Sequence, residues 1–182
     1  MTPLRLAVII GREGRTGDRI GRWFVDRARR RDGLAVTVVD LVDHDLAGSR
    51  PAEPTPAMRS FVAQVARAEA FVVVTAEYNH SFPGSLKQAI DHAYDEWQAK
   101  PVGFVSYGCG SIGQHAVDQL RTVFTALHAV TMRDVVGVDL LDGEPAPPAA
   151  DRCERAADVL LDQLRWWGLA LRDGRAARPY VS

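Results

Sequence analysis

The sequence lacks long apolar runs, and this absence restricts what the protein can be. None of its 182 residues falls in an uninterrupted apolar stretch of about 18 residues, the length that crosses a bilayer. The first residues, Met1 to Leu6, enter an apolar run without the successive basic, hydrophobic and cleavage regions of a signal peptide. We therefore expect a soluble protein with no cleaved signal and no membrane partner.

Cysteine is scarce and charge of one sign is not in excess. Cys109 and Cys153 are far apart in the sequence and fit no metal-ligand spacing, so neither a disulfide framework nor a zinc site is predicted. A cytoplasmic location is the expectation. With 22 basic and 23 acidic residues the net charge is -1, which provides no overall field for a polyanion. We expect no nucleic-acid partner.

Short apolar runs alternate with longer segments of helical periodicity, a pattern typical of βαβ units and a parallel sheet. We predict a single domain over residues 1–182: an α/β fold with a doubly wound five-stranded parallel sheet, order 2-1-3-4-5, and helices on both faces. Loops are expected at 43–55 and 142–150. The predicted strands are 4–10, 34–41, 70–75, 101–107 and about 131–139, and the predicted helices are 18–31, 56–68, 84–97, 113–129 and 150–171.

A glycine-rich polar turn, Gly11 to Asp18, follows the first predicted strand and opens onto a helix. The free N–H groups and the dipole of a helix N-terminus favour an anion. Arg12 and Arg15 are suited to charge-assisted hydrogen bonds with phosphate oxygens, and the Thr16 hydroxyl adds a further donor. The turn fits neither the P-loop nor the three-glycine dinucleotide pattern. Ordinary turn chemistry with solvated arginines remains an alternative.

The loop after the third predicted strand, Ala76 to Gly84, concentrates polar and aromatic side chains where a doubly wound sheet binds its ligands. Tyr78 and Phe82 offer flat apolar surface to a planar ring, and Asn79 can both donate and accept hydrogen bonds. For both aromatic side chains the alternative is ordinary packing beneath the loop, and this alternative is the stronger one for Phe82.

One long segment resembles a known family. The hallmark of the NADPH-dependent FMN reductase family is similar to the run Glu77-Tyr78-Asn79-x-Ser81-x-Pro83-Gly84-x-Leu86-Lys87, followed by Ala89-Ile90-Asp91. Downstream, Glu96-Trp97 and residues 100–108 resemble the family's next helix end and fourth strand. The sequence departs from the family where Gly11 runs directly into Arg12, which shortens the first loop, and at Ala76, where the family commonly has proline.

This resemblance implies a flavodoxin-like fold and an oxidoreductase in which NADPH or NADH reduces FMN. Electrons then pass to a small-molecule acceptor: free flavin, a quinone, an azo compound or a metal oxyanion. A homodimer or homotetramer is also implied. The residues matched to the FMN phosphate are Arg12, Arg15, Thr16 and Gly17, those matched to the flavin are Glu77, Tyr78 and Asn79, and those in the glycine-rich segment beside the ring are Ser106, Gly108, Cys109 and Gly110.

We predict no catalytic side chain, because hydride transfer between two bound cofactors requires orientation and no acid or base. No metal site is predicted either, since the histidines have no close ligand spacing with carboxylates. Lys87 and Asp91 are expected to pair on a helix surface. Trp166 and Trp167 are expected to pack in the core or at a subunit contact. A flavodoxin-type electron carrier and a non-catalytic ligand-binding protein remain alternatives.

Overall fold

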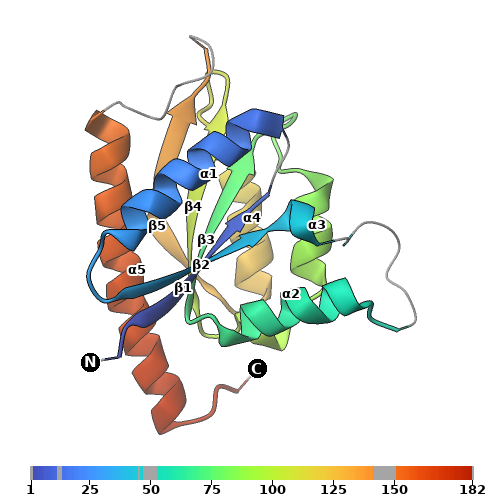
Figure 1. The fold of residues 1–182 in the computed structure, drawn as a ribbon, viewed down its shortest axis with the longest axis vertical. Coiled ribbons are helices and arrows are strands. Elements are labelled where there is room, and N and C mark those ends of the chain that lie inside the picture. The colour runs from blue at the N-terminus through green and yellow to red at the C-terminus, as the bar shows by residue number, and fades with distance from the viewer. Residues whose placement is uncertain (1, 12–13, 45, 47–52, 142–150, 182) are drawn as a thin grey trace.

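A five-stranded parallel sheet forms the centre of the protein (Figure 1). The computed structural model describes residues 2–11, 14–44, 46, 53–141 and 151–181. The sheet order is β2-β1-β3-β4-β5, so the predicted doubly wound, flavodoxin-like fold is confirmed. Its strands are β1 (Leu4–Ile10), β2 (Leu34–Asp40), β3 (Ala70–Ala76), β4 (Pro101–Gly108) and β5 (Val130–Asp139).

Helices cover both faces of the sheet, and each face has its own apolar core. Helices α1 and α5 pack on one face, and α2, α3 and α4 pack on the other (Figure 1). Every residue of β3 and β4 is buried, as expected for central strands covered on both sides. The helices are α1 (Gly14–Arg29), α2 (Pro56–Arg67), α3 (Gly84–Asp91), α4 (Gln114–Ala126) and α5 (Asp151–Ala177), with short 3₁₀ helices at Leu41–Asp43 and Asp95–Trp97.

Three predicted helix boundaries are wrong. The first helix begins at Gly14 rather than at residue 18, which places part of the predicted anion-binding turn inside the helix. The helix predicted over 84–97 ends at Asp91, because the Trp97 indole N–H donates to the carbonyls of Ile90 and Ala93 and closes the helix end. The last helix continues past its predicted end at residue 171 to Ala177.

Gly168 marks a close approach and not a helix end. A Cβ at this position would lie 2.6 Å from Leu4 Cδ2, so the glycine allows α5 to lie directly against β1. The predicted loop at 142–150 lies outside the described residues, as do residues 45 and 47–52 of the loop predicted at 43–55. No described helix has the length and apolarity needed to span a membrane.

Two predictions about surface residues have different outcomes. The Lys87 ammonium lies 2.6 Å from Asp91 Oδ2, which confirms the predicted surface ion pair. The side chains of Trp166 and Trp167 are 64% and 39% exposed, so the prediction that they pack in the core is wrong. A subunit contact at these tryptophans stays a prediction.

Lys100 is a buried cation at the end of the sheet opposite the carboxyl ends of the strands. Its ammonium donates to the carbonyls of Val65 and Ala66, each at 3.1 Å, in the last turn of α2. The same group lies 5.5 Å from the centre of the Phe71 ring. Burial, and after it the positive charge of Arg175, lower the pKa of Lys100 to about 8.

We predict that the Lys100→Met variant removes a pH-dependent component of stability. In the unfolded chain the lysine pKa is near 10.5, so between pH 8 and 10 the unfolded state binds more protons than the folded state. The free energy of unfolding of the wild-type protein should therefore rise with pH in this window, by about 2 kcal/mol relative to the variant. Urea unfolding at a series of pH values measures this difference.

The control is Lys87→Met, which removes the exposed lysine paired with Asp91. This variant should follow the wild-type pH dependence between pH 8 and 10. An identical pH slope in wild type and Lys100→Met would contradict the lowered pKa of Lys100.

Candidate functional site

The carboxyl ends of three neighbouring strands bring the predicted site together. Strands β1, β3 and β4 are adjacent and parallel, so the chain leaves each of them at the same edge of the sheet. The Gly11 N–H donates to the Val74 carbonyl at 3.0 Å, and the Glu77 N–H donates to the Tyr107 carbonyl at 2.9 Å. These bonds hold the first residue of two loops against the neighbouring strand.

The N-terminus of α1 forms the first side of the site. Arg12 lies outside the described residues, whereas Arg15, Thr16 and Gly17 form the first turn of α1. This turn contains no acidic residue, and Arg15 is exposed. A Cβ added to Gly14 would meet no atom of the described residues within 4 Å. The N–H groups of a first helical turn point out along the helix axis, and together with the Arg15 charge they suit a phosphate.

Gly17 has a packing role at this helix end. It is buried, and a Cβ at its position would lie 2.5 Å from the Tyr107 hydroxyl oxygen. The absence of a side chain therefore allows α1 to approach the end of β4. Gly17 acts on the candidate phosphate site by placing the helix, while Arg15 is the exposed side chain of this turn.

The loop after β3 forms a tight turn with an exposed tip. The Tyr78 N–H donates to the Ser81 carbonyl at 2.8 Å, and the Ser81 N–H donates back to the Tyr78 carbonyl at 2.9 Å. Between them, Asn79 and His80 have φ values of 49° and 63°, as in type I′ turns. The Tyr78 side chain is 46% exposed, so the alternative that it packs beneath the loop is wrong. Phe82 packs against the α2–α4 core, which confirms the packing alternative for that residue.

The loop after β4 depends on glycine. The buried Ser106 hydroxyl donates to the Ile112 carbonyl at 2.8 Å and so holds the loop closed. Gly113 has a φ of 81°, and a Cβ there would lie 2.5 Å from Ser106 Cβ. The backbone at Gly113 therefore requires glycine. The Ser106 hydroxyl is engaged inside the protein, so this predicted site residue supports the loop and its side chain does not face a ligand.

Gly108, Cys109 and Gly110 have different surroundings. Gly108 is buried, and Cys109 and Gly110 are exposed. The Gly110 N–H donates to Asp139 Oδ1 at 3.0 Å, so this amide is engaged by β5 rather than directed to a ligand. That bond, with a second from the Leu141 N–H, holds the pKa of Asp139 below its ordinary value. Sequence reasoning missed Asp139, because nothing in the pattern of β5 indicates that its last residue binds the neighbouring loop.

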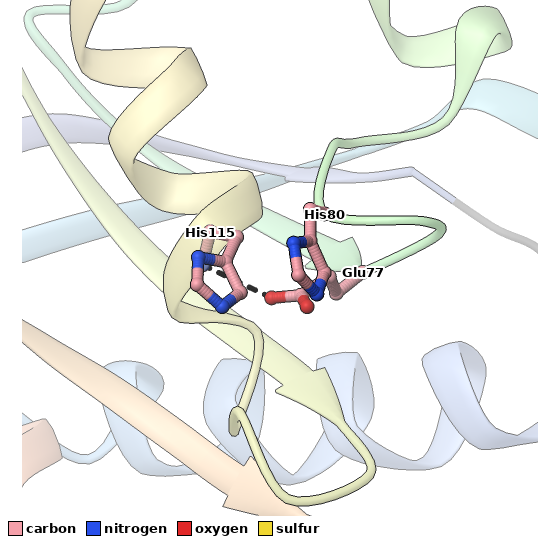
Figure 2. A group of neighbouring side chains, drawn as sticks. All are labelled: Glu77, His80 and His115. Carbon is pink, nitrogen blue, oxygen red and sulfur yellow. Dashed lines mark hydrogen bonds between the residues drawn. The ribbon is translucent and has the colours of Figure 1, made fainter.

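Glu77 connects the β3 loop to α4. Its Oε2 atom accepts a hydrogen bond of 3.0 Å from the His115 N–H in the first turn of α4. The His80 and His115 rings stack with centroids 4.1 Å apart and planes 20° apart (Figure 2). The sequence predicts Glu77 as a site residue but neither histidine, because His80 lies in the β3 loop, His115 lies in α4, and only the fold brings them together.

Comparison with known proteins finds a family model and relatives named as FMN reductases and quinone reductases. The family model described as NADPH-dependent FMN reductase matches residues 4–140. An NAD(P)H-dependent FMN reductase of Schizosaccharomyces pombe is 34% identical over 134 residues, which cover 68% of this chain and 66% of that protein. A quinone reductase of Pseudomonas putida is 35% identical over 100 residues, which cover 47% of this chain and 52% of that protein. The chain thus matches about two thirds or less of the length of these relatives.

Solved structures agree on the fold. An oxidoreductase from Corynebacterium diphtheriae superimposes with a TM-score of 0.74 at 17% identity, over 93% of this chain and 99% of that one. A flavoenzyme NAD(P)H:(acceptor) oxidoreductase from Paracoccus denitrificans gives a TM-score of 0.67 at 18% identity, over 93% and 98% of the two chains. Because the family model covers most of the chain, including the three loops at the strand ends, the protein belongs to the NADPH-dependent FMN reductase family.

Proposed function

We propose that the protein is an NAD(P)H-dependent flavin oxidoreductase that binds FMN at the carboxyl edge of β1, β3 and β4. The observation that carries this proposal is the meeting of the α1 N-terminus, with its exposed Arg15, and the loops after β3 and β4 at one edge of the sheet. Membership of the NADPH-dependent FMN reductase family supports the choice of ligand.

The residues present fit the two chemically different parts of FMN. The first turn of α1 offers backbone N–H groups, the Arg15 guanidinium and the Thr16 hydroxyl to a phosphate. The exposed Tyr78 side chain and the Asn79 amide offer an aromatic face and hydrogen bonds to a planar heterocycle. Gly110 is exposed and has no side chain, and a Cβ there would be 3.9 Å from its nearest described neighbour, Leu141, so the β4 loop allows a ring to approach its backbone at this position.

When bound, FMN supplies the group that accepts a hydride from the nicotinamide and passes electrons onward. The protein's own contribution is to bind and orient. Ser106 and Gly113 hold the β4 loop in its shape, and Asp139 fixes Gly110. Glu77 ties the β3 loop to α4. In this proposal these residues position the loops, and no side chain is assigned as an acid or base.

We propose a quinone as the acceptor class, since relatives from Pseudomonas putida and Burkholderia sp. are named as quinone or benzoquinone reductases. The open side of the site at Tyr78 suits a small planar molecule that takes the place of the nicotinamide. A homodimer or homotetramer in the cytoplasm remains part of the proposal, with the exposed Trp166 and Trp167 as a candidate subunit contact.

Anaerobic mixing of the FMN-loaded protein with NADPH tests the activity. We expect the visible absorbance band of the oxidised flavin to disappear within about a second, and to return when a quinone is added. Repeating the reaction with NADH measures the nucleotide preference. Flavin that stays oxidised would support the electron-carrier alternative, and failure to bind FMN would support a non-catalytic ligand-binding protein.

Reversing the charge at Arg15 tests the phosphate position. The Arg15→Glu variant should bind FMN at least tenfold more weakly, because it removes a cation and adds an anion beside the helix N-terminus. Its affinity for riboflavin, which has no phosphate, should change less than twofold. Fluorescence quenching of each flavin by the protein measures both dissociation constants.

A matched control for this charge change is Arg133→Glu, which alters an exposed arginine on β5 outside the candidate site. The control should bind FMN and riboflavin as the wild type does. Equal losses of FMN and riboflavin affinity in Arg15→Glu would place the phosphate away from α1.

Alanine substitutions at two glycines of the β4 loop test what determines the shape of this loop. Gly113→Ala should lower the free energy of unfolding by about 2 kcal/mol and weaken FMN binding, because its Cβ would collide with Ser106 in addition to the strain of a positive φ. Gly110→Ala has a similar φ of 78° but its nearest described neighbour, Leu141, is 3.9 Å away.

Chemical denaturation and FMN titration of both variants separate the effect of the collision with Ser106 from the effect of backbone strain. Gly110→Ala should lose only the cost of backbone strain, about 1 kcal/mol. If the two variants lose the same stability, the contact between Gly113 and Ser106 does not determine the shape of the loop.

A further inference from the structure

Three side chains with metal-binding chemistry meet beside the candidate flavin site, on its α4 side (Figure 2). Glu77 follows the last residue of β3, His80 lies in the turn after it, and His115 is the second residue of α4. One ligand atom from each residue lies within 4.8 Å of the others. Both histidines are exposed and Glu77 is half-buried, so the group is accessible from solvent.

We propose that Glu77, His80 and His115 bind a divalent transition-metal ion, with Zn²⁺ the ion that fits this ligand set best. Two imidazoles and one carboxylate form a common three-ligand zinc set that leaves a fourth position for water or another ligand. Mg²⁺ and Ca²⁺ prefer sites made of oxygen atoms, so two nitrogen donors select against them.

The backbone holds the three residues near one another without the ion. The paired hydrogen bonds between Tyr78 and Ser81 fix the turn that carries His80. The hydrogen bond from the His115 N–H to Glu77 Oε2 fixes the distance between the β3 loop and α4. Because that bond occupies only one lone pair of one carboxylate oxygen, Glu77 retains oxygen lone pairs for an ion.

The stacked rings must move when an ion binds. Imidazole nitrogens bind metals in the plane of the ring, and two nearly parallel rings 4.1 Å apart do not direct their lone pairs at one point. Metal–ligand bonds of about 2.0 to 2.2 Å also place the ligand atoms of a tetrahedral site roughly 3.4 Å from one another. The ligand atoms of Glu77, His80 and His115 lie up to 4.8 Å apart without the ion, so they must move closer together. Rotation of one exposed histidine about its side-chain torsions supplies both changes at small cost.

Calorimetric titration of the metal-free, flavin-free protein with Zn²⁺ tests the site independently of any redox activity. We expect one ion per chain and a dissociation constant in the micromolar range or below. His80→Ala, His115→Ala and Glu77→Gln should each weaken binding at least tenfold. Glutamine retains an oxygen that accepts the His115 N–H, so the last variant removes the charge and keeps the loop contact.

Matched controls are His92→Ala and His128→Ala, which remove histidines whose rings contact the Leu46 carbonyl and Tyr180, outside the proposed site. They should bind Zn²⁺ within twofold of the wild type. Cys109→Ser tests the exposed thiol of the neighbouring loop and should also bind normally. Loss of binding in Cys109→Ser with retention in the histidine variants would overturn the proposal.

NMR of the histidine rings tests the site in the wild-type protein, so its result does not depend on whether a variant folds. Addition of Zn²⁺ should shift the ring nitrogen resonances of His80 and His115 and leave those of His44, His92 and His128 unchanged. No binding of Zn²⁺ at millimolar concentration, or shifts confined to the other histidines, would overturn the metal site. FMN binding measured on the same samples tests the proposed cofactor site separately, so the two proposals fail independently.

Discussion

The parallel pairing of β1, β3 and β4 is the constraint on which the rest of the structure depends. In register, Ile10 lies beside Val74, and Ala76 lies beside Tyr107, so three chain segments leave the sheet together at one edge. The buried apolar side chains on both faces of β3 and β4 fix this register, because a slip would move each side chain to the opposite core. Residues that are distant in the sequence therefore meet at the candidate site.

The loops at this edge are held by polar groups that the chain itself supplies. Ser106 closes the β4 loop, Asp139 binds the amide of Gly110, and Glu77 binds the N-terminus of α4. The Glu77 contact satisfies an N–H in the first turn of α4, which has no partner within the helix. The surfaces left open by these contacts are the first turn of α1 and the exposed turn at Tyr78. A ligand with a phosphate at one end and a planar ring at the other matches these two surfaces.

Apolar patterning was sufficient to predict the fold, because each buried strand is a short, nearly continuous run of β-branched and aromatic residues such as 70–75. The helix at 84–97 was predicted too long because apolar spacing continues to Trp97. Its early end depends on the indole N–H of Trp97 bonding back to Ile90 and Ala93, a tertiary contact that spacing does not reveal.

Local motifs predicted which loops form the candidate site but not the role of each side chain. Residues 77–79 follow β3 and Arg15 lies in the first turn of α1, and their contact with FMN stays a prediction. Ser106 and Gly17 were predicted as ligand contacts, yet their surroundings are a neighbouring carbonyl and the Tyr107 hydroxyl. The pairing of His80 with His115 was not predicted, because it requires the β3 and β4 loops to be adjacent in space.

The central claim is that one sheet edge holds both ends of FMN, and a crystal structure of the protein grown with FMN tests it most directly. The account predicts the phosphate within hydrogen-bonding distance of the N–H groups in the first turn of α1, and the flavin ring between the Tyr78 turn and the loop at 106–110. FMN bound at another edge of the sheet, or with its phosphate away from α1, would contradict the account.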